Sequence, residues 1–284
     1  MFFKNEFTTI SEEFSEDISK IKTQYIIGNF EFCDKSFPES SKTVLRIYLS
    51  HPIDFYRRSR IRNAWNSSHF AANVYFRTVF ILGSDLVSTN QIKMENDAYG
   101  DIILVDLQEN YYNLTRKVMK AVMWTKFFCK KAQYLLKIDS DVYSNEAKVA
   151  SIVSNLPKEN LYAGWCVPVK PTRYKFSKYF VSYEEYKSEN YPMFCNGPAY
   201  ILSKDVVSKI FSAMQHVPYF KLEDVYMGMC FEQAITSYHP VDIPNFLTAM
   251  FPDTSCRNLE KFAFIHAQEM APVVCPDVFR NLVP

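Results

Sequence analysis

Apolar residues along the chain follow two patterns in turn, one typical of strands and one typical of helices. Short runs rich in β-branched and aromatic residues predict strands at 43–51, 77–84, 101–107 and 132–143. Between the last two runs, Leu114, Val118 and Val122 recur at helical spacing and predict a helix. The third run is apolar on both faces, as a buried parallel strand requires. Strand, helix and strand in alternation predict an α/β fold with a mainly parallel central sheet.

The second half of the chain continues this alternation. We expect a helix at about 145–155, a strand at 161–168, a loop rich in Lys, Tyr and Pro to about 195, a strand turning into a helix at 198–214, and a helix start near 223. Residues 1–41 are polar and irregular. We therefore expect an N-terminal tail or stem-like segment at 1–41 and a single domain at 42–284.

Composition narrows the classes of function. A net charge of +1 argues against nucleic-acid binding through a general basic field, and six glycines make a glycine-rich phosphate loop improbable. No run approaches the roughly 18 apolar residues that span a bilayer. The acidic N-terminus also lacks the apolar core of a signal peptide. These features favour an ordinary globular protein over one that binds nucleic acid through a general basic field.

Seven cysteines are scattered along the chain, and none forms a C-x-x-C pair. A zinc site is therefore unlikely. The scatter is typical of a secretory enzyme with a few disulfides, and the odd number leaves at least one thiol free. A reduced cytosolic protein could carry the same number, so both compartments stay open on this ground.

Two carboxylates follow the strand at 132–143 where it ends. In open α/β sheets, ligands bind outside the carboxyl ends of the strands. Asp139 and Asp141 lie two residues apart, so they share one face of a continued strand or meet at a turn. Carboxylate oxygens suit Mg²⁺ or Mn²⁺ better than zinc. The alternative is a solvated turn in which an aspartate caps the next helix.

Six segments resemble, in order, the motifs of the family-31 glycosyltransferases, the β-1,3-galactosyltransferase and β-1,3-N-acetylglucosaminyltransferase group. They are RRSRIRNAW at 57–65, FILG at 80–83, the run YGDIILVDLQENYYNLTRK and onward at 99–129, LKIDSDVY at 136–143, the loop ending in CNGPAYILS at 177–203, and EDVYMGMC at 223–230. The resemblance covers about residues 43–270. Each motif alone is weak, but their joint order is highly specific.

The resemblance implies a GT-A glycosyltransferase fold and an inverting hexosyl transfer from a UDP-sugar, galactose or N-acetylglucosamine, to a glycan acceptor in β-1,3 linkage. It also implies Mn²⁺ against the donor diphosphate, where a divalent cation neutralises charge on the leaving group. Asp141 is then the direct metal ligand, and Asp139 serves the ribose or a metal-bound water. His266 matches a late family histidine that completes the metal shell; packing in the core is the alternative.

Glu223 and Asp224 form the second acidic pair. By the match to the family's E-D-V, Asp224 is the base that takes the acceptor hydroxyl proton, and Glu223 helps to hold the acceptor. The alternative is a pair of carboxylates favoured at a helix N-terminus by the helix dipole.

Five further residues are candidates for the donor side. Arg58 and Arg62 offer planar forks for phosphate or uracil oxygens, and Lys117 could reach the diphosphate. Asp106 stands at a strand end and could touch the nucleoside, while Gly197 would let the backbone approach the sugar closely. A surface salt bridge is the alternative for each basic residue, and a strand-end cap is the alternative for Asp106.

Two departures from the family keep a second function open. Ser140 replaces the middle aspartate of the acidic motif, and Pro198 stands where the family usually has glycine. Pro198 removes a backbone donor. A weak or inactive member that binds glycans or acts as a scaffold is therefore one alternative, and a two-metal hydrolase is a weaker one. The resemblance places the protein on the lumenal side of the Golgi membrane, held by an anchor that this sequence does not show.

Overall fold

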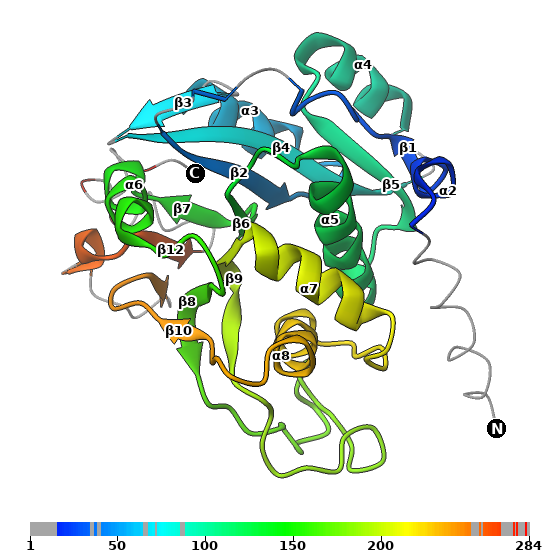
Figure 1. Ribbon diagram of the computed structural model, residues 1–284, viewed down its shortest axis with the longest axis vertical. Helices are drawn as coiled ribbons and strands as arrows, with labels where there is room; N and C mark the ends of the chain where they lie inside the picture. Colours follow the sequence, from blue (N-terminus) through cyan, green and yellow to red (C-terminus); the bar gives the residue numbers. More distant parts are fainter. Residues whose placement is uncertain are drawn as a thin grey trace.

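The computed structural model describes residues 16–34, 37–38, 41–64, 68–71, 73–85, 89–250, 256, 258–267, 275, 277 and 282. Within these residues the main element is a sheet of nine strands in the order β1-β5-β4-β2-β6-β9-β8-β10, with β3 added beside β4 (Figure 1). The strands are β1 (Tyr25–Ile27), β2 (Lys42–Leu49), β3 (Ser68–Ala71), β4 (Val74–Ser84), β5 (Ile102–Gln108), β6 (Tyr134–Asp139), β8 (Tyr162–Val167), β9 (Phe194–Ser203) and β10 (Val241–Asp242).

The expected α/β fold is confirmed, with β1, β3 and β9 antiparallel to their neighbours in the described sheet. Strands β5, β4, β2 and β6 are parallel neighbours. β9 then runs antiparallel to both β6 and β8. Its first residues therefore lie beside the carboxyl end of β6. This reversal brings the Gly197 backbone to the edge of the sheet where Asp139 ends its strand.

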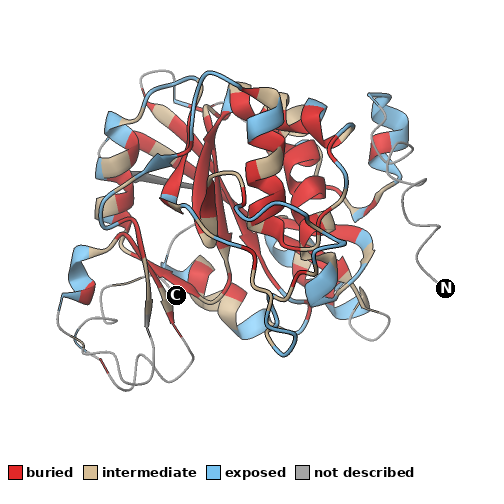
Figure 2. Ribbon diagram, turned by 90° about the horizontal axis from the view of Figure 1, so that it is seen from below, coloured by how far each residue is buried: buried red, intermediate tan, exposed pale blue. Residues whose placement is uncertain are grey.

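Helices cover both faces of the sheet, and each face has its own apolar core. One face is packed by α5 (Leu114–Phe128), α7 (Lys204–Met214) and α8 (Glu223–Ala234), and the other by α3 (Phe55–Ala64), α4 (Thr89–Tyr99) and α6 (Glu146–Asn155). Figure 2 shows the strands buried between helices whose outer faces are exposed. Burial on both faces explains why the strands read as continuous apolar runs.

A smaller sheet lies beside the turn that carries Asp139 and Asp141. Among the described residues it has the order β11-β12-β7, made by β7 (Val142–Ser144), β11 (Leu247–Met250) and β12 (Phe264–Ala267). β7 follows the β6 turn and pairs antiparallel with β12, so that His266 lies opposite Val142. This pairing brings His266, which follows Asp141 by 125 residues, beside the acidic turn.

The N-terminal segment differs from the expected tail. Residues 1–15, 35–36 and 39–40 lie outside the described residues, but α2 (Ile18–Lys22) and β1 pack on the domain. Ile21 and Tyr25 are buried, and the Tyr25 hydroxyl donates to the Lys120 carbonyl at 2.8 Å. β1 pairs with β5, and Cys33 is joined to Cys129. A few apolar positions and a disulfide thus hold a segment whose overall composition is polar.

The disulfide prediction is confirmed. Cys33–Cys129, Cys166–Cys195 and Cys256–Cys275 are bonded, and Cys230 remains a buried thiol. Among the helices that the structure describes, none is both long and apolar enough to cross a membrane.

Candidate active site

A cavity of about 500 Å³ opens at the carboxyl ends of β2 and β6. The ends of these two strands, the start of β9, the first turn of α8 and part of β12 supply its walls. Its lining includes seven of the residues predicted from the sequence: Lys117, Asp139, Asp141, Gly197, Glu223, Asp224 and His266. The three others, Arg58, Arg62 and Asp106, do not line it.

Lys137 lies at the centre of the acidic residues and is almost fully buried. Its Nζ lies 2.6 Å from Asp139 Oδ1 and 3.4 Å from Glu223 Oε2, and it donates to the Gly197 carbonyl. Burial alone would lower the pKa of Lys137, but Asp139 and Glu223 raise it above its ordinary value. Lys137 therefore stays charged and joins β6, β9 and α8 at one point.

Glu223 is a buried carboxyl held from two sides. The Tyr200 hydroxyl donates to its Oε1 at 2.7 Å, and Lys137 approaches the other oxygen. Burial raises the pKa of Glu223 to about 7, and the charges of Asp224 and Asp139 add to this shift. A carboxyl in this position is suited to holding its neighbours in place, since little of it reaches the cavity.

Asp224 is only partly exposed and lies at the mouth of two cavities. Its Oδ2 accepts from the Gly197 backbone N–H at 3.3 Å, and its Oδ1 accepts from the Val225 N–H at 2.9 Å. Burial raises its pKa above the ordinary value. A second cavity, of about 350 Å³, shares Asp224 and His266 with the first. Asp224 thus faces both spaces, as a group that acts between two substrates must.

Asp141 and His266 meet across the acidic turn. His266 Nε2 lies 3.1 Å from Asp141 Oδ2. Burial by itself would raise the pKa of Asp141, but the contact with His266 lowers it, while the same contact raises the pKa of His266. Among the described residues, no three His, Cys, Asp or Glu side chains converge as a complete metal-ligand set.

Lys117 lines the cavity from α5, but its ammonium is paired. Its Nζ lies 2.6 and 2.7 Å from the two oxygens of Glu109 and donates to the Ser50 carbonyl at 3.1 Å. Glu109 also accepts from the Gly83 N–H at 2.8 Å. A Cβ at Gly83 would meet the Leu107 carbonyl at 2.7 Å, so glycine is needed there. Burial lowers the pKa of Lys117 despite Glu109.

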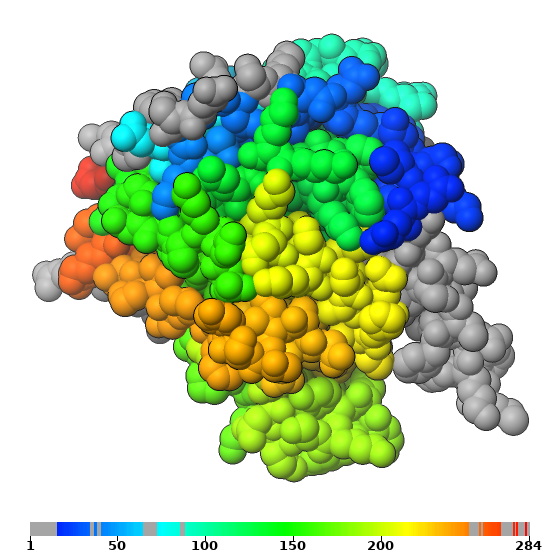
Figure 3. All heavy atoms as spheres, viewed as in Figure 1, coloured from blue at the N-terminus to red at the C-terminus, as the bar shows by residue number. Residues whose placement is uncertain are grey.

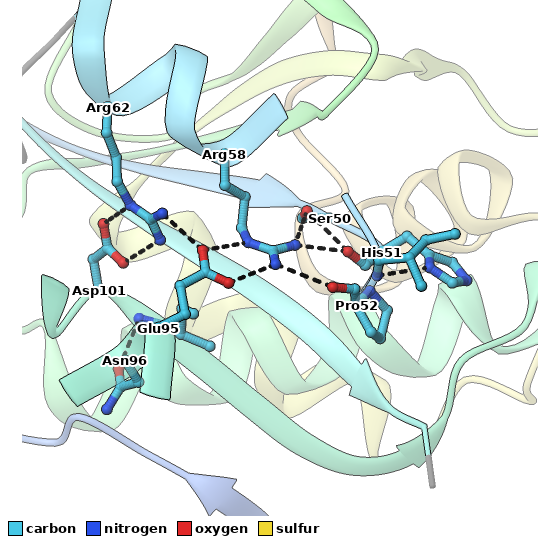
Figure 4. Close-up of polar contacts among 10 residues, drawn as sticks. Ser50, His51, Pro52, Arg58, Arg62, Glu95, Asn96 and Asp101 are labelled. Carbon is cyan, nitrogen blue, oxygen red and sulfur yellow. Dashed lines mark hydrogen bonds and ion pairs between the residues drawn. The ribbon is translucent and has the colours of Figure 1, made fainter. Parts of the chain in front are cut away.

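Arg58 and Arg62 belong to a buried charge network behind the cavity (Figure 4). Arg58 pairs with Glu95 at 2.6 Å, and Arg62 pairs with Glu95 at 2.7 Å and with Asp101 at 2.7 Å. These contacts join α3 to α4 and to the start of β5. The structure therefore directs both guanidinium groups to protein carboxylates and away from the cavity.

Arg58 also reaches the loop that follows β2. It donates to the Ser50 hydroxyl at 3.0 Å and to the carbonyls of His51 and Pro52 at 2.7 and 3.1 Å (Figure 4). Ser50 and His51 line the larger cavity. Arg58 thus positions part of the cavity wall without touching the space inside it.

Asp106 is exposed on β5 and lines neither of these two cavities. Its backbone N–H donates to the Gln24 carbonyl, which continues the pairing of β1 with β5. The described contacts of Asp106 favour the strand-end alternative.

Sequence reasoning did not single out Lys137 or Glu109 as site residues. Lys137 precedes Asp139 by two positions on the same strand, so a period of two already placed both side chains on one face. Glu109 lies eight positions before Lys117, and only the turn at η1 (Tyr111–Asn113) brings them together. Lys137 could have been found from the period-two pattern of its strand. Glu109 could be linked to Lys117 only from the geometry of the turn.

Comparison with known proteins gives the same family as the motifs. The family model described as galactosyltransferase matches residues 56–242. The chain is 34% identical over 194 residues to β-1,3-galactosyltransferase 5 of Homo sapiens, which covers 67% of this chain and 62% of that protein. It is 32% identical over 212 residues to β-1,3-galactosyltransferase 1 of Mus musculus, which covers 73% of this chain and 64% of that protein.

A solved structure of the bifunctional glycosyltransferase WbbM overlaps 82% of this chain and 46% of that chain, with a TM-score of 0.46 and 13% identity. That overlap is partial, so the assignment depends on sequence. The chain spans just under two thirds of the length of the curated relatives named above. With the family model matching well over half of its residues, the chain belongs to the family-31 galactosyltransferases, the group that its motifs resemble.

Proposed function

We propose that the protein is an inverting glycosyltransferase that moves galactose or N-acetylglucosamine from a UDP-sugar to a glycan hydroxyl in β-1,3 linkage. The observation that carries the proposal is the position of Asp224 between two adjoining cavities, one of which also contains the Asp139–Asp141 turn. The names of the relatives, β-1,3-galactosyltransferases 5 and 1, support the linkage and the sugar class.

The acidic turn fits a divalent cation by the chemistry of its donors. Carboxylate oxygens of Asp139 and Asp141 and the imidazole of His266 line one cavity. Asp139 Oδ1 is buried and, although close to Lys137, makes no hydrogen bond of favourable angle in the described residues. Asp141 and His266 would hold Mn²⁺ directly, and Asp139 would support it. When bound, the cation would neutralise charge on the departing diphosphate.

The residues of the chain supply the remaining chemistry. The acceptor hydroxyl lies in the second cavity and gives its proton to an oxygen of Asp224, while its own oxygen bonds to the anomeric carbon. The bond from that carbon to the diphosphate oxygen breaks on the opposite face, so the configuration inverts. The N–H groups of Gly197 and Val225 fix the orientation of the base. Glu223 and Lys137 hold the strand and helix on which these groups lie.

A donor screen tests this function. The protein is incubated with Mn²⁺, an acceptor glycan panel, and either UDP-galactose or UDP-N-acetylglucosamine, and UDP release is measured. We expect acceptor-dependent release with one donor, and the same rate in Asp97→Asn, an exposed residue of α4. Equal release without any acceptor would favour a hydrolase and would reject the transferase.

A glycan-binding protein without transfer activity is the second candidate. Pro198 favours it, because this residue lines both cavities and cannot donate a backbone hydrogen bond to either substrate. Binding of glycans without UDP release from either donor would support this candidate.

We also propose that the protein acts on the lumenal side of the Golgi membrane. Three disulfides among the described cysteines support an oxidising compartment. Loss of folded protein when it is expressed in a reducing cytosol, with recovery in an oxidising one, is the expected result.

A further inference from the structure

The loop that joins β8 to β9, residues 168–193, projects from the body of the molecule as a separate protrusion (Figure 3). Cys166–Cys195 closes the loop at its base. Arg173 holds the interior: it donates to the carbonyls of Val181 and Ser182 at 2.9 and 2.8 Å and to those of Tyr186 and Ser188 at 2.9 and 3.0 Å. A loop with a closed base and a central arginine is held in one shape before any ligand arrives.

This fixed loop exposes large aromatic side chains. Tyr174 is 66% exposed, Phe176 88%, Tyr179 49% and Tyr183 54%. Tyr174 and Phe176 meet edge to face at 5.5 Å, and Tyr183 stacks on Arg173 at 3.9 Å. The interior of the loop is held by Arg173 and the buried Val181, while the rings of Tyr174 and Phe176 lie exposed on its surface. A set of exposed aromatic rings on an ordered loop indicates a binding surface.

The aromatic surface of the loop continues into the candidate active site. Tyr179 lines both cavities, and Trp165, 38% exposed, lines the second one beside Asp224. Lys170, Thr172 and Asn196 add polar groups to the same wall. Rings alternating with hydrogen-bonding side chains match a pyranose, which has an apolar C–H face and a rim of hydroxyls. An obligate protein partner would instead favour an unbroken apolar area, which Lys175 and Lys178 interrupt.

We propose that the β8–β9 loop is a second acceptor subsite, which binds the sugar units of a neutral oligosaccharide that lie beyond the unit receiving the new sugar. The inference rests on the proposed function and adds the substrate class: an acceptor of several sugars, held by stacking on Tyr174 and Phe176. The unit nearest Asp224 lies in the second cavity, and the following units extend over the exposed rings.

Acceptor length gives the test. We compare kcat/KM for methyl β-glycosides of galactose and of N-acetylglucosamine with kcat/KM for neutral oligosaccharides that end in the same sugar. The double variant Tyr174→Ala/Phe176→Ala should lose about tenfold on the oligosaccharide, the size expected for two aromatic contacts, and nothing on the methyl glycoside. Tyr238→Ala, equally a half-exposed tyrosine but outside both cavities, is the matched control.

Three results overturn the proposal. They are an equal loss on short and long acceptors, an unchanged preference for oligosaccharides in the double variant, and binding to phosphatidylcholine vesicles that the double variant abolishes. Thermal unfolding of each variant shows that the fold is kept, since both rings are exposed.

A binding experiment separates this inference from the proposed function. If the wild-type protein releases UDP from neither donor, the proposed function fails, and binding to immobilised neutral oligosaccharides then tests the loop alone. Retention by the wild type that is lost in the double variant supports the subsite. Absence of retention on every neutral oligosaccharide rejects it.

Discussion

Two charged clusters are built differently: one joins α3 to α4 and the start of β5, and the other joins β6 to α8. Behind the cavity, Arg58 and Arg62 face Glu95 and Asp101, two positive groups against two negative ones (Figure 4). Beside the cavity, Lys137 faces the carboxylates of Asp139, Glu223 and Asp224. The first cluster has equal numbers of positive and negative groups, which pair with one another. The second has an excess of negative charge that a bound cation could compensate.

The pKa directions show the same contrast. Burial would raise the pKa of Glu95, but Arg58 and Arg62 lower it below its ordinary value. Burial raises the pKa of Glu223 to about 7. Removing a partner from a buried, paired carboxylate destabilises the fold, whereas a buried carboxyl with a raised pKa beside a cavity marks a candidate functional site. Charge balance and pKa direction therefore distinguish the structural cluster from the candidate functional one.

The largest expected effect tests the functional cluster. Asp224→Asn should lower transfer by about 10²–10⁴-fold, because an amide cannot take the acceptor proton. Binding of UDP, measured by calorimetry, should change little, since the amide keeps the shape of the side chain. Near-normal transfer would remove Asp224 as the base.

The balanced cluster is tested by stability. Arg58→Ala should reduce the free energy of unfolding by about 3–5 kcal/mol, because Glu95 loses one of its two buried partners. Urea unfolding measures this loss. Lys209→Ala, which breaks a surface ion pair with Asp205 on α7, is the control and should cost only about 0.5 kcal/mol. Equal losses in the two variants would contradict a structural role for the network.

Metal binding gives a further test of the difference between the two clusters. Mn²⁺ together with UDP should stabilise the wild-type protein by about 2.7 kcal/mol when the ligands are at a hundred times their dissociation constant. Thermal unfolding should show this shift, and EDTA should reverse it. Asp141→Ala should lose the Mn²⁺-dependent part; an unchanged shift in this variant would refute the ligand assignment.

The smallest expected effect is a difference in pH dependence. Glu223 binds its proton more tightly when folded, so its stabilising contribution is complete below pH 4.5 and is lost as the pH rises through about 7. Glu223→Gln should remove this decline, on the order of 1–3 kcal/mol, from urea unfolding curves recorded between pH 5 and 8.

The pKa of Glu95 shifts in the opposite direction to that of Glu223, so Glu95 serves as the comparison. Its folded pKa is lowered, so its contribution is present above the unfolded pKa and is lost as the pH falls through the folded value. Glu95→Gln should therefore lower the free energy of unfolding near neutral pH and approach the wild-type value at acid pH, where the wild type has lost this contribution. Identical profiles for the two glutamine variants would show that the clusters do not differ.

Local patterns predicted the elements that carry the site. The helix expected from Leu114, Val118 and Val122 is α5 (Leu114–Phe128), and the strand that ends at the acidic turn is β6 (Tyr134–Asp139). The apolar residues of α5 recur at helical spacing, and β6 is a continuous apolar run because it is buried on both faces. The position of Asp139 and Asp141 at a strand's carboxyl end followed directly.

Contacts between distant segments could not be predicted in this way. Arg58 and Arg62 gave no sign in the sequence that their partners would be Glu95 and Asp101, because those residues are more than 30 positions away. The antiparallel direction of β9 is likewise set by its connections, since an apolar run has the same pattern in either direction. Pairing of β1 with β5 also depends on tertiary contacts that the polar segment 1–41 does not reveal.

The Cys166–Cys195 disulfide has a consequence for how the protein matures. Cys166–Cys195 lies next to Trp165 and Asn196, both on the wall of the second cavity, and the Asn196 amide donates to the Trp165 carbonyl at 2.8 Å. Because the bridge ties together the two strands that carry Trp165 and Asn196, we expect this wall of the second cavity to reach its final spacing only once the disulfide has formed. Newly made chains would thus gain their full selectivity late, after oxidation and not on collapse.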